Sequence, residues 1–431
     1  MRLFLTTLAT LIIALGCAVG RAEAQGTTAD PRRIETEAAL KAGNLGRAAK
    51  TVGEWLSAEP AHPEALQLRA RIEFTQASRL RSNGQREAAR GYFTKADATF
   101  TLAGRHVATL WNSSYHAWGY CLHAVGQYRD AIDRLSRAVS GGAADADVWR
   151  LTSQCRRLLG ELDLAREAID RAIVINARDT LLHLERARIL AAQGRAKAAA
   201  EQLERHAARF QTDLKPAQRE VLRWLLGHYL GLEDLDRALV PLDRMCAADS
   251  DWAEGRVERG ILHYRRGDLT RAKQDLVVAL DGDASIKRYV RGRGVLHLGL
   301  IEQHEGDAEA AKGRFEQSLT LAPNEGAALL GLIACFRRAG DREQARGLAQ
   351  RARQTVELEE QIRRATVRLT LRPRDRDAHR SRLKVLLQLE RYEEARDFLQ
   401  AFAQELPGDS SIVEFGRELQ QKEADVKGRR P

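Results

Sequence analysis

The sequence predicts an all-α fold, an α-solenoid of about ten helix–turn–helix repeats, on three observations. First, five similar segments each have a glycine, an alanine five residues later and further apolar residues at helical spacing. They begin at Gly126, Gly160, Gly194, Gly267 and Gly306. Second, alanines at the equivalent position recur along the chain, and four of the nine intervals between them are 34 residues. Third, Ala, Leu, Arg and Glu predominate and aromatic residues make up only 6%, which favours helices over strands.

The first element in chain order is a predicted secretory signal peptide at residues 1–24. A basic start precedes an apolar run over residues 3–19, and Ala22-Glu23-Ala24 has the small–x–small pattern of a cleavage site. We therefore expect cleavage after Ala24 and export across the inner membrane of a bacterium to the periplasm. An alternative is an envelope lipoprotein acylated at Cys17, which follows Leu-Gly. Membrane attachment is expected only in that case.

A short linker at residues 25–30 leads to the predicted solenoid, residues 31–424. Ten anchor alanines mark its units: Ala48, Ala89, Ala131, Ala165, Ala199, Ala238, Ala272, Ala311, Ala345 and Ala395. Each small side chain allows the second helix of a unit to pack closely on the first. Residues 409–424 are expected to form a closing helix, because an Asp/Ser cap begins them. Residues 425–431 are expected to be a basic tail.

Glycine precedes most second helices because the turn needs a left-handed residue, which is costly for a side chain with a Cβ. Glu233 and Glu390 stand at this position in two units. The last interval, from Ala345 to Ala395, is 50 residues long. Residues 356–369 have a helical pattern, so we expect a lengthened helix or an additional one there.

These features resemble the tetratricopeptide repeat family, whose unit is a 34-residue helix–turn–helix. Trp118-Gly119 and Leu298-Gly299 match the large–small pair of its first helix, and prolines stand where its second helix closes, at Pro60, Pro323 and Pro407. The resemblance covers residues 30–424. It implies a right-handed superhelix in which the first helices line a concave groove.

In this family, positions 5, 9 and 12 of each first helix face the groove, and their spacing forms one stripe. The resemblance therefore implies a polar, basic-aromatic section formed by His116, Tyr120, His123, Arg150, Gln154 and Arg157. It implies an apolar section formed by Val257, Ile261, Tyr264, Leu296, Leu300 and Leu330. In the last full unit the stripe is basic again, with Arg380 and Lys384. An apolar groove suits a peptide segment or an amphipathic helix of a partner protein. Alternatively, the superhelix coils tightly, or its inserted helix fills the groove.

We expect no catalytic site, cofactor or metal. The sequence has no metalloprotease, phosphate-loop or nucleophile-elbow motif. His116 and His123 are seven residues apart on one helix, about 10.5 Å, too far to share one metal. Cys121, Cys155 and Cys335 fall at the same repeat position, so their separation excludes disulfides, and we interpret them as small core residues.

The net charge of +10 in 431 residues is only a mild bias, so we expect no nucleic-acid partner. Our first hypothesis is a non-catalytic scaffold outside the cytoplasm that mediates protein–protein interactions, in an envelope assembly or secretion complex. The alternative is a binder of a glycan or another acidic polymer through Tyr120, Arg150 and Arg157. An enzyme that assembles scattered acids and bases is a third hypothesis.

Overall fold

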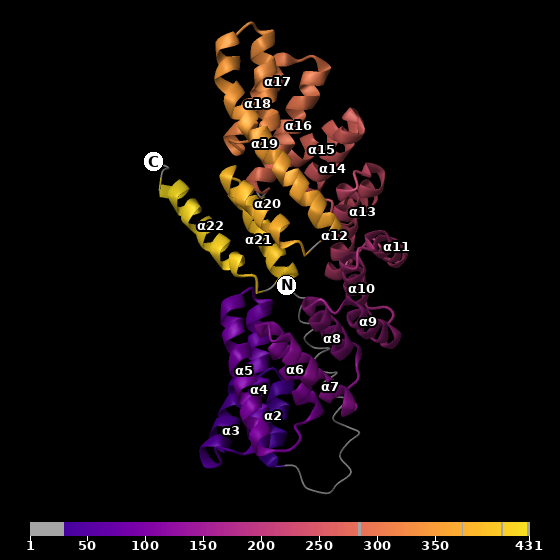
Figure 1. The fold of residues 1–431 in the computed structure, drawn as a ribbon, viewed down its shortest axis with the longest axis vertical. Helices are drawn as coiled ribbons and strands as arrows, with labels where there is room; N and C mark the ends of the chain where they lie inside the picture. Colours follow the sequence, from indigo (N-terminus) through magenta and orange to yellow (C-terminus); the bar gives the residue numbers. More distant parts are fainter. Residues whose placement is uncertain (1–29, 283–285, 373, 407, 429–431) are drawn as a thin grey trace. The chain divides into compact units, whose positions relative to one another are not determined.

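The computed structural model of the chain describes residues 30–282, 286–372, 374–406 and 408–428. Twenty-one helices and no strand occur in these ranges, so the predicted all-α repeat fold is confirmed (Figure 1). None of these helices is long and apolar enough to cross a membrane. The predicted signal peptide, its cleavage position, Cys17 and residues 25–29 lie outside the described residues.

Contacts divide the chain into two compact units, residues 1–189 and 190–431, with the boundary inside helix α10 (Thr180–Ala192). Unit 1 comprises consecutive helical hairpins. Its other helices are α2 (Pro31–Lys41), α3 (Leu45–Ala58), α4 (Pro63–Ser82), α5 (Arg86–His106), α6 (Asn112–Val125), α7 (Tyr128–Ser140), α8 (Ala146–Leu159) and α9 (Leu162–Ile175).

Unit 2 continues the same alternation. Its helices are α11 (Ala196–Ala207), α12 (Pro216–Gly231), α13 (Leu235–Ala248), α14 (Ala253–Arg266), α15 (Leu269–Gly282), α16 (Arg288–Glu305), α17 (Ala308–Leu321), α18 (Gly326–Arg338), α19 (Arg342–Leu371), α20 (Arg376–Gln388), α21 (Tyr392–Glu405) and α22 (Ser410–Gly428). The helix α22 runs into the segment expected to be a basic tail. Residues 424–427 are Ala-Asp-Val-Lys, with no Gly or Pro to end the helix before Gly428.

The anchor alanines are the packing points between the two helices of each hairpin. All ten are at most 4% exposed. Close approach explains the neighbouring small residues too: a Cβ on Gly119 of α6 would lie 2.7 Å from Leu135 Cγ of α7. Each hairpin buries one face against the next, so the core runs along the stack instead of forming one centre.

Turn chemistry follows the sequence pattern. Gly126 and Gly160 adopt left-handed φ values of 93° and 84° directly after α6 and α8. Glu233 and Glu390 adopt φ values of 57° and 58° at the equivalent turns. A left-handed conformation costs a residue with a Cβ about 1–2 kcal/mol. Neighbouring helices therefore keep the turn geometry even where the glycine is missing.

The long interval before Ala395 is explained by α19, a single helix of 30 residues. Its first half pairs with α18, and its second half reaches α20 and α12. The approach to α12 is close, because a Cβ on Gly231 would lie 2.3 Å from Thr370 Oγ1. Thus α19 connects repeats that are far apart in the sequence of unit 2.

Candidate functional site

The predicted polar section of unit 1 is a charged cluster on α6, α8 and α10. Asp147 accepts a hydrogen bond from Arg150 Nε at 2.9 Å and lies 3.3 Å from His116 Nε2. Its pKa is far below the usual range, because Arg150 and His116 outweigh the effect of burial. His116 and Arg150 are therefore engaged by an acid of the same unit.

The second arginine of the stripe, Arg157, is also paired internally. Its Nε donates to Glu185 Oε1 at 2.7 Å, and both side chains are buried. Arg188 lies 3.9 Å from the other carboxylate oxygen of Glu185. Glu185 is on α10, outside the predicted stripe, and sequence reasoning missed it. The signal that could have found this pair is an acid 28 residues after Arg157, on the first helix of the next hairpin.

Tyr120 and His123 lie among aromatic rings. The Tyr120 ring centroid is 5.4 Å from that of Phe74 and 5.8 Å from that of Phe93, and the Arg81 guanidinium lies over it at 5.4 Å. Burial, with Arg81 and Arg150 nearby, lowers the pKa of His123 to about 4. His123 is therefore neutral at pH 7, and it and Tyr120 extend the unit 1 core.

The chemistry available to this cluster is limited. Each guanidinium of the predicted stripe has a carboxylate partner, so the cluster offers little uncompensated charge to an acidic polymer. Among the described residues, no group of three or more His, Cys, Asp or Glu side chains could hold a metal ion. The four described cysteines are free and buried. Burial raises the pKa values of Cys155 and Cys246 to about 12 and about 11, so these thiols are poor nucleophiles.

The predicted apolar section of unit 2 is core for the most part. Val257 and Ile261 are buried among Ala272, Leu276 and Leu298, and Leu296 is buried against Phe315. These three side chains offer no surface to a partner in this structure, which corrects the expectation of an accessible apolar stripe. The physical reason is that an apolar side chain on a first helix packs onto its hairpin partner wherever the register allows.

The remaining predicted residues are dispersed. Tyr264 and Leu300 are half-buried at the edges of these clusters. Leu330 is 51% exposed, and Lys384 is exposed on α20. Arg380 is engaged by the cap of α22, with its NH2 group 3.0 Å from Asp409 Oδ1. The structure therefore does not bring the unit 2 residues together into one apolar lining.

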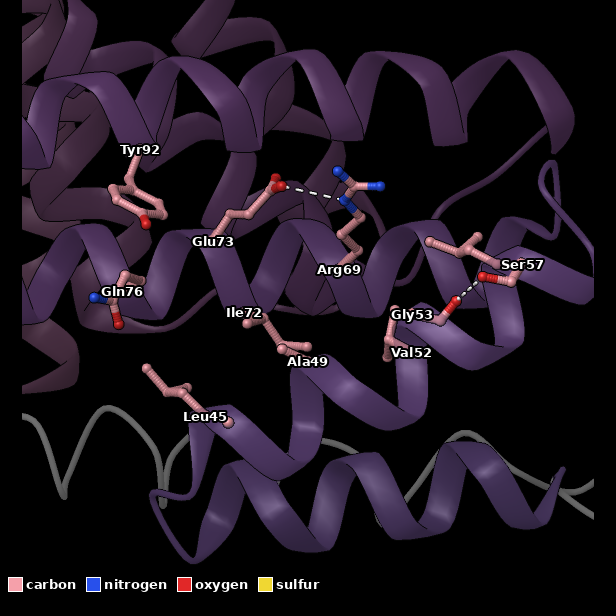
Figure 2. Close-up of a pocket in the computed structure, with 12 residues that line it drawn as sticks. Leu45, Ala49, Val52, Gly53, Ser57, Arg69, Ile72, Glu73, Gln76 and Tyr92 are labelled. Atoms are coloured by element: carbon pink, nitrogen blue, oxygen red, sulfur yellow. Dashed lines mark hydrogen bonds and ion pairs between the residues drawn. The ribbon is translucent and has the colours of Figure 1, made fainter.

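Sequence reasoning missed a hollow in unit 1 between α3, α4 and α5 (Figure 2). It has a volume of about 600 Å³. Leu45 and Ala49 of α3 form the apolar floor that solvent reaches, above the buried Val52 of α3 and Ile72 of α4, and Tyr92 of α5 lies at one end. The size and lining suit one or two apolar side chains of a partner.

A pair of charged side chains lies at the rim of this hollow. Arg69 Nε lies 3.3 Å from Glu73 Oε1, and Figure 2 shows this pair above the floor. Gly53 leaves the hollow open, because no atom lies within 4 Å of where its Cβ would be. The only sequence signal was a pair of glycines, Gly46 and Gly53, on one helix with apolar neighbours.

Comparison with known proteins identifies the repeat. The family model described as tetratricopeptide repeat matches residues 119–180 and 359–410. The chain carries tetratricopeptide repeats. Both matched segments contain the hairpin alternation described above, α6 to α9 and the end of α19 to α21. None of the curated proteins compared with the chain matches it.

Several solved structures are similar to this chain at low sequence identity. MamA from Desulfovibrio magneticus RS-1 is 22% identical, covers 43% of this chain and 96% of its own, and has a TM-score of 0.32. The quorum sensor NprR from B. thuringiensis is 13% identical, covers 75% and 97%, and has a TM-score of 0.40. The hetero-tetramer Cut9–Hcn1 of the APC/C is 14% identical, covers 95% and 99%, and has a TM-score of 0.29.

Proposed function

We propose that the chain is a non-catalytic scaffold that binds segments of partner proteins, and that it acts after export, in a periplasmic assembly. Tetratricopeptide repeats support a protein–protein interaction scaffold. The observation that supports binding of a partner segment is the apolar hollow between α3, α4 and α5, which is open to solvent at Gly53. A partner helix with an apolar side chain facing the hollow would bury that side chain there.

The acidic-polymer alternative has less support. Arg150 and Arg157 are neutralised by Asp147 and Glu185, and Tyr120 is half-buried among aromatic rings. A polymer would therefore have to displace existing ion pairs before it gained new ones. Binding in the hollow would break no ion pair, because its floor is apolar and the charges at its rim, Arg69 and Glu73, pair with each other.

A substitution that fills the hollow tests the proposal. Gly53→Phe places a ring at the opening without touching the core. Gly91→Phe is the matched control, because Gly91 is also an exposed helical glycine with no atom within 4 Å of its Cβ position. Each form is used to capture proteins from a solubilised envelope extract, which are then identified by mass spectrometry.

The expected result is a protein that the unmodified chain and Gly91→Phe retain, in low and high salt, and that Gly53→Phe loses. Equal retention by all three forms would exclude the hollow as the binding site. A fraction that is retained only at low salt, and equally by all forms, would favour the acidic-polymer alternative.

Export is tested separately. We propose cleavage after Ala24 and, as the alternative, acylation at Cys17. The mass and the N-terminal residue of the protein from fractionated cells distinguish them. A protein that begins at Gln25 in the periplasmic fraction supports export, and a lipid-bearing Cys17 supports the lipoprotein. An intact Met1 in the cytoplasmic fraction contradicts both.

A further inference from the structure

The last helices of unit 2 form a subassembly with a core of its own. Leu386 of α20, Phe402 of α21 and Leu419 of α22 are buried together, and Ile362 at the end of α19 packs against them. This cluster is separate from the clusters that hold α14 to α18 together. The helices α20–α22 therefore do not need the face of α16 to complete their apolar packing.

The helix α21 nevertheless lies against the first turns of α16, and its contacts there are polar. Lys287 Nζ lies 2.7 Å from Asp397 Oδ2, and Tyr289 Oη donates to the same oxygen at 3.2 Å. The backbone N–H of Tyr289 donates to Glu393 Oε2 at 3.4 Å. Two acids one helical turn apart on α21 thus face the beginning of α16.

A second polar group holds the start of α21 beside α18. Arg391 donates to Glu325 Oε2 and to the carbonyl oxygen of Asn324, both at 3.1 Å, and pairs with Glu359 of α19. The Asn324 side chain donates to the carbonyl oxygen of Leu389 at 3.3 Å. These contacts join residues that are 32 to 67 positions apart in the sequence.

The charges on the two sides are complementary. The start of α16 has four basic residues within seven positions, Lys287, Arg288, Arg291 and Arg293. On α14, Glu258 pairs with Arg293 at 2.7 Å and Glu254 accepts from the Lys287 N–H. The first two turns of α21 add Glu393, Glu394 and Asp397. The hydrogen bond to Asp397 raises the pKa of Lys287, and the charges of Glu258 first and then Glu394 raise the pKa of Arg293.

We propose that the first turns of α16 form a docking surface for an acidic helix of a partner protein, and that α21 occupies this surface as a built-in substitute. The seated helix shows which partner chemistry fits: a helix whose first turns carry two acids at i and i+4. The inference rests on the proposed scaffold function but concerns another surface, so each is tested on its own.

The contacts allow exchange. The side chains of Lys287 and Asp397 are 46% and 40% exposed, and exposed ion pairs contribute little and weaken in salt. Because α20–α22 keep their own core, the first turns of α21 can leave α16 without unfolding, once the contacts of Arg391 with Asn324 and Glu325 are also broken. Bound in cis, α21 competes at the high effective concentration of a tethered segment. A partner helix therefore binds tightly only when α21 is released.

Hydrogen exchange of the full chain, measured by mass spectrometry, tests whether α21 is releasable. The opening variant is Glu393→Lys with Asp397→Lys, which turns the seated acids into bases opposite Lys287. We expect amides in residues 286–293 to exchange about tenfold faster, while amides around Phe402 stay protected. Raising the salt from about 0.1 to about 1 M, which shortens the Debye length from about 10 to about 3 Å, should act in the same direction.

Two further variants separate opening from a general effect of charge. Glu414→Lys with Glu418→Lys makes the same charge change at exposed positions of α22 and should leave residues 286–293 protected. Lys287→Asp with Asp397→Lys swaps the two charges of one ion pair. In this variant, residues 286–293 should keep most of the protection that they have in the unmodified chain. Unchanged exchange at residues 286–293 in the opening variant would overturn the inference.

A binding measurement tests the docking surface. The probe is a labelled synthetic peptide with the sequence of residues 391–405, RYEEARDFLQAFAQE, titrated into each full-length form. We expect the opening variant to bind it about tenfold more tightly than the unmodified chain, because the competing segment is displaced. Adding Lys287→Glu to the opening variant should abolish that gain. Equal binding by all forms would refute the docking surface and leave the hollow of unit 1 unaffected.

Discussion

Arg157 on α8 and Glu185 on α10 form a buried ion pair, with Nε 2.7 Å from Oε1 and side chains that are 7% and 1% exposed. The pair joins the first helices of two consecutive hairpins in unit 1. We predict that Glu185→Ala lowers the free energy of unfolding by about 3–5 kcal/mol, because it leaves a guanidinium buried without its main partner.

Urea denaturation followed by circular dichroism measures the loss. Arg157→Leu with Glu185→Leu is the control, and it should be far closer to the unmodified chain because both charges are removed together. If Glu185→Ala costs less than about 1 kcal/mol, the buried pair contributes no more than an exposed ion pair does, which contradicts the prediction.

A second prediction concerns pH. The pKa of His123 is lowered to about 4 by burial and by Arg81 and Arg150, whereas an unfolded histidine titrates near about 6.5. Between these values the unfolded state binds more protons, so stability falls as pH decreases from about 7 towards about 4. At pH 5 we expect His123 to account for about 1–2 kcal/mol of this loss. His297, whose pKa is also about 4 because of burial, adds a similar loss in unit 2.

Thermal unfolding between pH 7 and pH 5 tests this, because the carboxylates with lowered pKa values affect stability mainly below pH 5. His123→Gln should make the midpoint of thermal unfolding depend less on pH. An exposed histidine, His106, provides the control, and His106→Gln should leave the slope as it is. A slope that His123→Gln does not change would contradict the assignment.

A third prediction concerns the turn at Glu233, whose φ of 57° lies in the left-handed region. Glu233→Gly should stabilise the chain by about 0.5–1 kcal/mol, because relief of the left-handed strain exceeds the added flexibility of the unfolded chain. The midpoint of thermal unfolding should rise accordingly. Glu233→Ala keeps the Cβ and should give no such gain. A lower midpoint for Glu233→Gly would mean that the Glu233 side chain stabilises the turn.

A fourth prediction separates core from surface in unit 2. Leu296→Ala should cost about 2–5 kcal/mol, because Leu296 is buried against Phe315. Leu330→Ala on the neighbouring first helix should change stability by no more than about 0.5 kcal/mol, because Leu330 is 51% exposed. Chemical denaturation of the two variants side by side measures the contrast. Equal losses of stability in the two variants would mean that both side chains are buried to the same extent, as the predicted stripe along one groove implies.

The hairpin fold was predictable from local signals. A small residue at each anchor and a left-handed turn before each second helix recur in the sequence, and these two constraints act within one hairpin. Even Glu233 and Glu390 were recognisable as turn residues, because their spacing from the next anchor matches that of the glycines.

The site was less predictable because it depends on packing between hairpins. The sequence placed Leu296 and Leu330 at the same repeat position, but one is buried and the other is exposed. The pairing of Arg157 with Glu185 spans 28 positions and needs the register of consecutive hairpins. The hollow at Gly53 and the seating of α21 on α16 depend on surfaces that three or more helices form together, which no single periodicity encodes.

The 30-residue helix α19 has a consequence for how the polypeptide acquires its structure. Most hairpins contact only their neighbours, so unit 1 can fold progressively, one hairpin after another along the chain. Unit 2 contains α12, whose surface at Gly231 is completed only by Thr370 near the end of α19. Its early repeats therefore remain incomplete until α19, more than a hundred residues further along the chain, has packed against them, and until then they depend most on holding factors.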